Sequence, residues 1–243
     1  APTTRFAHNT EVRVQDLIPP VYAGFAEPIF AGKITQWNDA KITAVNAGTA
    51  LPNSKINLVV RSDSSGTTYN FTNYLSKVSP EFKTAVGEDS KVNFPAGSLG
   101  GKGNDGVASY VKQAKNSIGY VELAYALQNN MPYASMQNAA GNWIQPSEES
   151  FAAAAANADW ASAPDFNLVI TDAPGEEAWP ITATNFILMQ KQPKNPQGSK
   201  NTIEFFRWVY ANGDAEARKL GYVPLPDALV KQIETYWSKN MNY

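Results

Sequence analysis

The chain has 243 residues, of which 43% are hydrophobic and 17% are charged, and its formal net charge at pH 7 is −2. This composition is typical of a folded protein with one large domain or two lobes, and it excludes an intrinsically disordered chain. The small negative net charge gives no support for a nucleic acid or an anionic membrane as a partner. The sequence has no cysteine and a single histidine, His8. Thiol catalysis is therefore excluded, a multi-histidine metal site or a histidine triad is disfavoured, and we expect no metal and no cofactor.

Apolar periodicity predicts short strands that alternate with helices. Strands are expected at residues 11–14, 56–60, 117–121, 168–171 and 186–189. Helices are expected at residues 40–45, 67–77, 80–86, 107–113, 123–129, 152–156, 203–211 and 228–238. This order indicates an α/β architecture with a largely parallel or mixed sheet that is flanked by helices.

One loop between a predicted strand and a predicted helix carries the strongest functional signal, Arg61-Ser62-Asp63-Ser64-Ser65-Gly66-Thr67-Thr68. A helix that begins here leaves backbone N–H groups at the positive end of its dipole, where oxyanions bind. Gly66 lets a ligand approach the backbone closely, and Arg61 adds a planar fork for two oxygens of a phosphate or carboxylate. An anion site is the favoured interpretation. The alternative is a serine or threonine N-cap beside a solvated arginine.

A second loop, residues 97–106, is dense in glycine. It lacks the ending of a nucleotide-binding P-loop, because Lys102 is followed by Gly103 and Asn104 rather than by a serine or threonine. We interpret it as a structural loop that leads into the helix at 107–113, with Asn104 or Asp105 as the N-cap.

The remaining residues show no catalytic arrangement. Trp37, Trp179 and Trp208 are expected to pack in the core or at a hinge rather than to stack on a ligand. The carboxylates are scattered along the sequence rather than spaced as metal ligands, namely Asp63, Asp105, Glu122, Glu176 and Glu177. The protein is therefore not expected to be an enzyme, and a phosphatase is the alternative to be tested with a chromogenic phosphate ester.

From about Ile29 to its end, the chain resembles the periplasmic phosphate-binding proteins of bacterial ABC-type phosphate uptake systems. The resemblance rests on blocks that follow one another in the family order, and these are residues 29–39, 61–68, 71–75, 100–106, 117–122, 178–181 and 205–208. It implies that Arg61, Ser65, Gly66 and Thr67 contact phosphate oxygens. It also implies that Asp63 pairs with Arg61 and orients it, whereas an Asx-type turn or N-cap is the structural alternative for Asp63 alone.

The resemblance does not extend to residues 1–24, which lack the first-lobe motifs of the family. We therefore expect three parts: a divergent N-terminal segment at 1–24, a second lobe with the anion-binding loop at 25–177, and a segment at 178–243 that belongs to an incomplete first lobe. The absent motifs include the aspartate that accepts the phosphate proton in the family. Discrimination between phosphate and sulfate is therefore expected to weaken.

The resemblance implies that the protein binds inorganic phosphate, or another tetrahedral oxyanion, for delivery to the membrane subunits of an ABC importer. The chain begins at Ala1 without a methionine or a leader sequence. We interpret it as an exported periplasmic or secreted protein, or as a trimmed form of one. The alternative is a structural or interaction protein that reuses the scaffold, as a homo-oligomer or with a second chain that completes the lobe.

Overall fold

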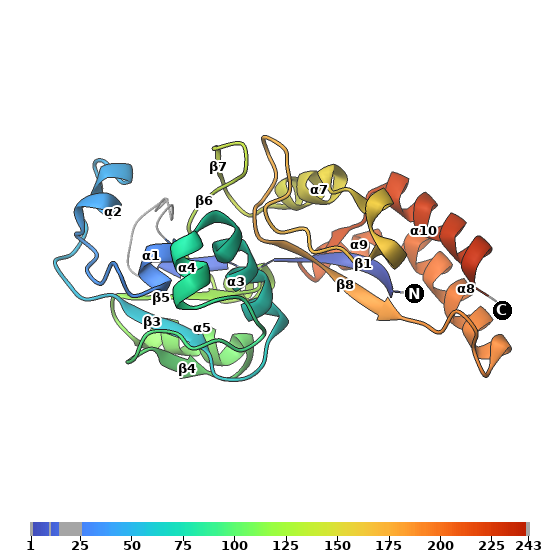
Figure 1. Cartoon of the computed structure of the whole chain (residues 1–243), viewed down its shortest axis with the longest axis horizontal. Coiled ribbons are helices and arrows are strands. Elements are labelled where there is room, and N and C mark those ends of the chain that lie inside the picture. Colours follow the sequence, from blue (N-terminus) through green and yellow to red (C-terminus); the bar gives the residue numbers. More distant parts are fainter. Residues whose placement is uncertain (1, 10, 15–25, 242–243) are drawn as a thin grey trace.

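The computed structural model describes residues 2–9, 11–14 and 26–241, and its helices pack around two larger sheets (Figure 1). For residues 2–14 only the backbone is considered. Residues 1, 10 and 15–24 of the expected N-terminal segment lie outside the described residues.

The first sheet is mixed and has the strand order β2-β5-β3-β4, with bounds Glu11–Val14, Ser117–Val121, Asn57–Arg61 and Leu99–Gly101. Strand β3 is parallel to both β4 and β5, whereas β2 is antiparallel to β5. All five residues of β5 are buried. A mixed sheet with apolar side chains on both faces needs helices on both sides, and this chain provides them.

The two longest helices of this region cover opposite faces of the first sheet. Helix α3 (Gly66–Val78) packs Phe71 and Leu75 into the core that contains Val60 of β3. Helix α5 (Gly103–Gln113) packs Val107 against Val59, the neighbouring residue on the same strand. Successive strand residues point to opposite faces, and for this reason the continuous apolar run of β3 fits between two helices.

Shorter elements complete this region. They are α1 (Ala26–Phe30), α2 (Ala40–Val45), α4 (Pro80–Ala85), α6 (Leu123–Gln128) and the hairpin of β6 (Met136–Gln137) and β7 (Trp143–Ile144). Trp37 is 1% exposed in the same core as Trp179, which is 0% exposed. A residue from far along the chain thus helps to close the first core.

The second sheet is antiparallel and has the order β8-β1-β9, with bounds Thr182–Leu188, Pro2–Asn9 and Val223–Pro224. A separate core lies beside it. Helix α8 (Pro196–Asn212) contributes Ile203, helix α10 (Asp227–Asn240) contributes Ile233 and Trp237, and Ile187 of β8 packs against them. Around this core lie α7 (Glu148–Asn157), α9 (Asp214–Lys219) and two 3-10 turns at Trp160–Ser162 and Pro164–Phe166.

The chain passes between the two sheets at two points that lie next to each other. Strand β1 belongs to the second sheet and β2, which begins two residues after it, belongs to the first. Ile181 is fully buried in the first core, and Thr182 directly after it pairs with Asn9 at the end of β1. These neighbouring crossings bring the start of β8 close to the first sheet.

Most predicted elements are present, and the exceptions have physical reasons. Residues 168–171 form a loop rather than a strand; Ile170 packs in the second core while Val169 is 38% exposed, so the alternating pattern reflects packing instead of pairing. The strand expected at 186–189 runs from Thr182 to Leu188. Trp208 was expected in the core or at a hinge, but it is 61% exposed on α8, so it does not pack in the core.

The start of helix α5 also differs from the prediction. The N-cap position is held by Lys102, whose side chain makes no capping hydrogen bond, so neither Asn104 nor Asp105 is the N-cap. The side chain of Asn104 instead contacts Arg61 and Glu122. Its role belongs to the site described next.

Candidate anion-binding site

Helix α3 begins directly after the loop that follows β3. Ser65 is its N-cap, and the Ser65 hydroxyl oxygen accepts a hydrogen bond from the Thr68 N–H at 3.2 Å. The N–H groups of Gly66 and Thr67 belong to the first turn of this helix, so they lie at the positive end of its dipole, where an anion is stabilised.

The guanidinium of Arg61 is fixed at the end of β3 by two neighbours. Its Nε and Nη2 donate to the two oxygens of Asp63 at 2.9 and 2.7 Å, and its Nη1 donates to the Asn104 amide oxygen at 3.3 Å. The Arg61 side chain is only 10% exposed. An arginine has five N–H donors, and three are used among the described residues, which leaves two for the oxygens of a ligand.

Asp63 acts on Arg61 and on the glycine-dense loop together. Besides the two bonds from Arg61, its Oδ1 accepts a hydrogen bond from the Gly103 N–H at 3.1 Å. The hydrogen bonds from Arg61 first, and then that from Gly103, hold the pKa of Asp63 well below its ordinary value of 3.8. The same hydrogen bond to Asp63 raises the pKa of Arg61 above its ordinary value. Both groups are therefore charged over the whole physiological range of pH.

Tyr120 of β5 supports the site from the core. Its ring stacks on Phe71 of α3 with centroids 4.5 Å apart. Its hydroxyl accepts a hydrogen bond from the Arg61 N–H at 3.3 Å and shares a hydrogen bond with the Thr68 hydroxyl at 2.8 Å. Burial raises the pKa of Tyr120 to about 12, so the hydroxyl stays neutral. This one side chain ties β5, the end of β3 and the first turn of α3 together.

A cavity of about 390 Å³ opens at the carboxyl ends of the parallel strands. In open α/β sheets, ligands bind outside this end of the strands, where helix N-termini also gather. The cavity is lined by Arg61, Ser64, Ser65, Gly66, Thr67, Asn70, Asn104, Glu122, Ala183, Thr184 and Asn185. The last three residues belong to β8, so the cavity lies where the second sheet meets the first.

The four residues expected to contact an anion therefore all line one cavity. Asp63 does not line it and instead holds Arg61. Four of the other lining residues were not expected in the site, and these are Asn104, Glu122, Thr184 and Asn185. Asn104 lies shortly after the end of β4, and Glu122 directly follows β5. Both could have been predicted from the tendency of ligands to bind at the carboxyl ends of parallel strands. Thr184 and Asn185 come from the other sheet, and no local pattern marks them.

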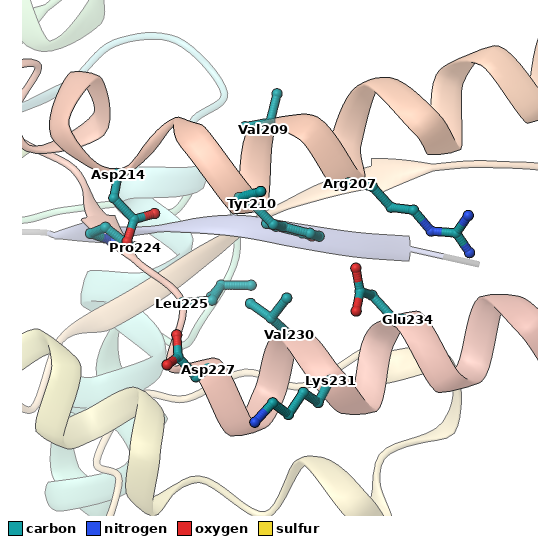
Figure 2. Close-up of a pocket in the computed structure, with 11 residues that line it drawn as sticks. Arg207, Val209, Tyr210, Asp214, Pro224, Leu225, Asp227, Val230, Lys231 and Glu234 are labelled. Carbon is teal, nitrogen blue, oxygen red and sulfur yellow. The ribbon is translucent and has the colours of Figure 1, made fainter.

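A second cavity, of about 200 Å³, lies between α8 and α10 (Figure 2). Its charged lining consists of three acidic residues and two basic ones, namely Asp214, Asp227, Glu234, Arg207 and Lys231. The excess of carboxylates disfavours an anion there. Among the described residues that line the cavity at the start of α3, only Arg61 and Glu122 are charged, and the helix N–H groups also lie there. It is the better candidate for binding an oxyanion.

Within the described part of the chain, no group of three or more His, Asp or Glu side chains is placed to hold a metal ion. No helix in that part is both long enough and apolar enough to cross a membrane.

Sequence comparison matches residues 27–212 to a family described as a PBP superfamily domain. Two similar relatives are named phosphate-binding protein PstS. The protein from Xylella fastidiosa strain 9a5c is 66% identical over 210 residues, and that from Methanocaldococcus jannaschii is 37% identical over 222 residues. The matches cover 86% and 84% of this chain, but only 57% of each relative. The chain thus spans well under two thirds of the length of these relatives.

Structure comparison finds the same fold in solved phosphate-binding proteins. A human phosphate-binding apolipoprotein superposes with a TM-score of 0.73 at 19% identity, covering 98% of this chain and 71% of that one. A phosphate-binding protein from Stenotrophomonas maltophilia superposes with a TM-score of 0.70 at 18% identity, covering 97% and 70%. The expected periplasmic-binding-protein fold, with its sheet flanked by helices, is therefore confirmed.

Proposed function

The chain belongs to the PBP superfamily, and from this premise we propose that it binds inorganic phosphate in the cavity at the start of α3. The observation that carries the proposal is the fixed orientation of the Arg61 guanidinium. Its guanidinium is held by Asp63 and Asn104, lines the cavity and keeps two N–H donors for a ligand. An arginine that is oriented before the ligand arrives loses little freedom on binding, and this increases affinity.

Three kinds of donor meet a tetrahedral anion in this proposal. Arg61 binds two oxygens, the N–H groups of Gly66 and Thr67 bind at the helix dipole, and the hydroxyls of Ser65 and Thr67 add neutral donors. Asp63 does not touch the ligand and fixes the plane of the guanidinium. No step of this proposal makes or breaks a covalent bond, so the protein acts as a binding protein rather than as an enzyme.

The wider role that we propose is capture of phosphate outside the cytoplasmic membrane and delivery to the membrane subunits of an ABC importer. Relatives named phosphate-binding protein PstS, and a solved Vibrio cholerae structure described as an ABC-type phosphate transport receptor, support this role. We also propose a periplasmic location, which is supported by the description of one solved phosphate-binding protein as periplasmic. We also propose the three-part division of the chain at residues 24 and 177.

A second function, as an interaction subunit, is favoured by a different observation. Phe205 and Trp208 of α8 are 55% and 61% exposed, and Leu188 at the end of β8 is 81% exposed. Exposed apolar side chains of this size are typical of protein contact surfaces. Size-exclusion chromatography over a range of concentrations tests for self-association through these residues. An Arg-dependent phosphate signal from a monomer would reject this role as the main one.

The phosphate proposal is tested by isothermal titration of the chain with phosphate, beside Arg61→Ala and Arg61→Lys. Loss of two charge-assisted hydrogen bonds predicts at least a hundredfold weaker binding for Arg61→Ala, from about 1.5–3 kcal/mol per bond. Arg61→Lys keeps the charge but not the fork, and we expect an intermediate loss. Arg218→Ala is the control, because Arg218 pairs with Glu148 and Asp214 away from the cavity. Equal affinities for the wild type and Arg61→Ala would contradict the proposal.

A further inference from the structure

Two threonines at the start of β8 differ in what their hydroxyl groups contact. The Thr182 hydroxyl donates a hydrogen bond to the Trp179 carbonyl oxygen at 3.0 Å. The Thr184 Oγ1 is also buried, but it has no hydrogen-bond partner among the described residues. A buried hydroxyl without a partner destabilises a folded protein, because it has lost its hydrogen bonds to water and gained nothing in return. The unpaired hydroxyl of Thr184 therefore needs an explanation.

The position of Thr184 suggests one. Thr184 lines the cavity at the start of α3, in which Arg61 and the first turn of the helix are also lining elements. Thr182 is 0% exposed and is not among the described lining residues of that cavity. The unpaired hydroxyl thus belongs to a side chain at the candidate anion site, whereas the paired one belongs to the protein interior.

The backbone pairing of β8 is irregular at this point. Thr184 pairs with Ala7 of β1. Phe186, two residues further along β8, pairs with Thr4, which lies three residues before Ala7. This extra residue in β1 is a β-bulge, a feature that increases the local twist of a strand pair and is frequent beside active sites. Adjacent side chains of a regular strand point to opposite faces, yet residues 183–185 all line one cavity, and the bulge accounts for this departure.

We propose that the Thr184 hydroxyl donates a hydrogen bond to an oxygen of the bound oxyanion, as the contribution of the second sheet to the site. This inference rests on the proposed function of the same cavity. A threonine hydroxyl can occupy different staggered positions about χ1, so a rotation of the side chain takes it from its unpaired place into the cavity. There it gains a hydrogen bond to a charged group, which is stronger than one between neutral groups.

The proposal makes opposite predictions for the free and the bound protein. Thr184→Val replaces the hydroxyl by a methyl group of nearly the same shape. It removes an unpaired buried group, so the free protein should be at least as stable as the wild type in urea denaturation. It also removes a donor to a charged ligand, so isothermal titration should show about tenfold weaker binding of phosphate. Thr184→Ser keeps the donor and should restore most of the affinity.

Thr182→Val is the matched control, because it makes the same chemical change two residues earlier on the same strand. It leaves the Trp179 carbonyl oxygen without the hydroxyl that donates to it. The free protein should therefore become less stable, while its affinity for phosphate should equal that of the wild type. The two valine variants thus separate a hydroxyl that serves the ligand from one that serves the fold.

Three results would overturn the role of Thr184. The first is wild-type affinity for phosphate in Thr184→Val. The second is a loss of stability in Thr184→Val like that in Thr182→Val, which would show a structural hydroxyl. The third is binding by Thr184→Ser that is as weak as that of Thr184→Val. If the wild type binds phosphate in an Arg61-dependent way, each of these leaves the site itself standing. If the wild type binds no phosphate, the proposed function fails, and the role of Thr184 fails with it.

Discussion

The two sheets of this molecule contribute to the candidate site in different ways. In the first sheet, the parallel strands β3, β4 and β5 end at one edge, and the helices that follow begin there. Among the lining residues that the structure describes, this edge supplies the two charged ones, Arg61 and Glu122, together with the N–H groups of α3. The described lining residues from the antiparallel second sheet are the neutral Ala183, Thr184 and Asn185.

The direction of the strands explains why the two sheets contribute differently to the site. Parallel strands direct every following loop to the same end of the sheet, so polar groups from distant parts of the sequence converge. Antiparallel strands alternate their ends, and a single strand, β8, reaches the cavity with its first residues. We therefore expect the first sheet to determine affinity and the second to act as a wall that adds a smaller contribution.

The largest expected effect is a loss of stability from a substitution in the first sheet. A Cβ at Gly101 of β4 would lie 2.5 Å from the backbone of Gly106 and Val107 in α5, a distance at which the backbone must shift. Gly101→Ala should lower the free energy of unfolding by about 3 kcal/mol, measured by urea denaturation. Gly66→Ala is the control, since a Cβ there meets nothing within 4 Å. Equal stability of the Gly101→Ala variant and the wild type would disprove the close contact of strand and helix.

A smaller effect sharpens the division of roles within the first region. Asp63→Asn keeps the shape of the side chain but removes the charge that orients Arg61, and phosphate should bind roughly tenfold more weakly. Titration calorimetry at pH 7 measures the loss. Wild-type affinity in this variant would mean that Arg61 is positioned without Asp63.

Asp63 also makes a pH-dependent contribution to stability. Its pKa in the folded protein is lower than the ordinary 3.8, so the folded state holds this proton more weakly than the unfolded state. The contribution is therefore fully present well above pH 3.8 and is lost as the pH falls from there towards the folded pKa. The difference in unfolding free energy between wild type and Asp63→Asn should be constant from pH 7 to 5 and shrink at pH 3. A constant difference at all three values would contradict this linkage.

The smallest expected effect concerns the second region. Asn185 lines the cavity from β8, and Asn185→Ala removes a neutral amide, which predicts a two- to tenfold loss of phosphate affinity, or about 0.5–1.5 kcal/mol. Asn201→Ala on the exposed side of α8 provides the control. A loss as large as that of Arg61→Ala would show that the second sheet contributes as much to phosphate affinity as the first. This would contradict the smaller role that we assign to it.

Sequence patterns predicted what depends on neighbouring residues. The run before Arg61 predicted a strand, and the serine-rich loop after it predicted the start of α3. The four residues expected to contact an anion line one cavity, and they are Arg61, Ser65, Gly66 and Thr67. The apolar spacing of Phe71, Tyr74 and Leu75 predicted the buried face of that helix, and all three are buried. These features follow from the local chemistry of a strand, a cap and an amphipathic helix.

What the sequence did not show depends on contacts between distant segments. Asn104 was expected to cap α5, but its amide is used between Arg61 and Glu122, and a longer-range contact replaced the local one. Glu122 was regarded as an isolated carboxylate, because nothing near it in sequence indicates that β5 ends beside β3. Trp208 is a large apolar residue of a type that usually packs in a core, and only the packing of α8 shows that it faces outward.

The central claim is that a tetrahedral anion binds between the first turn of α3 and the start of β8. Backbone amide NMR of the labelled protein during a phosphate titration tests it most directly. We expect the largest shifts at the N–H groups of Gly66 and Thr67, with smaller saturable shifts at Thr184 and Asn185, and no change around α10. Saturable shifts confined to the cavity between α8 and α10, or none at Gly66 and Thr67, would contradict it.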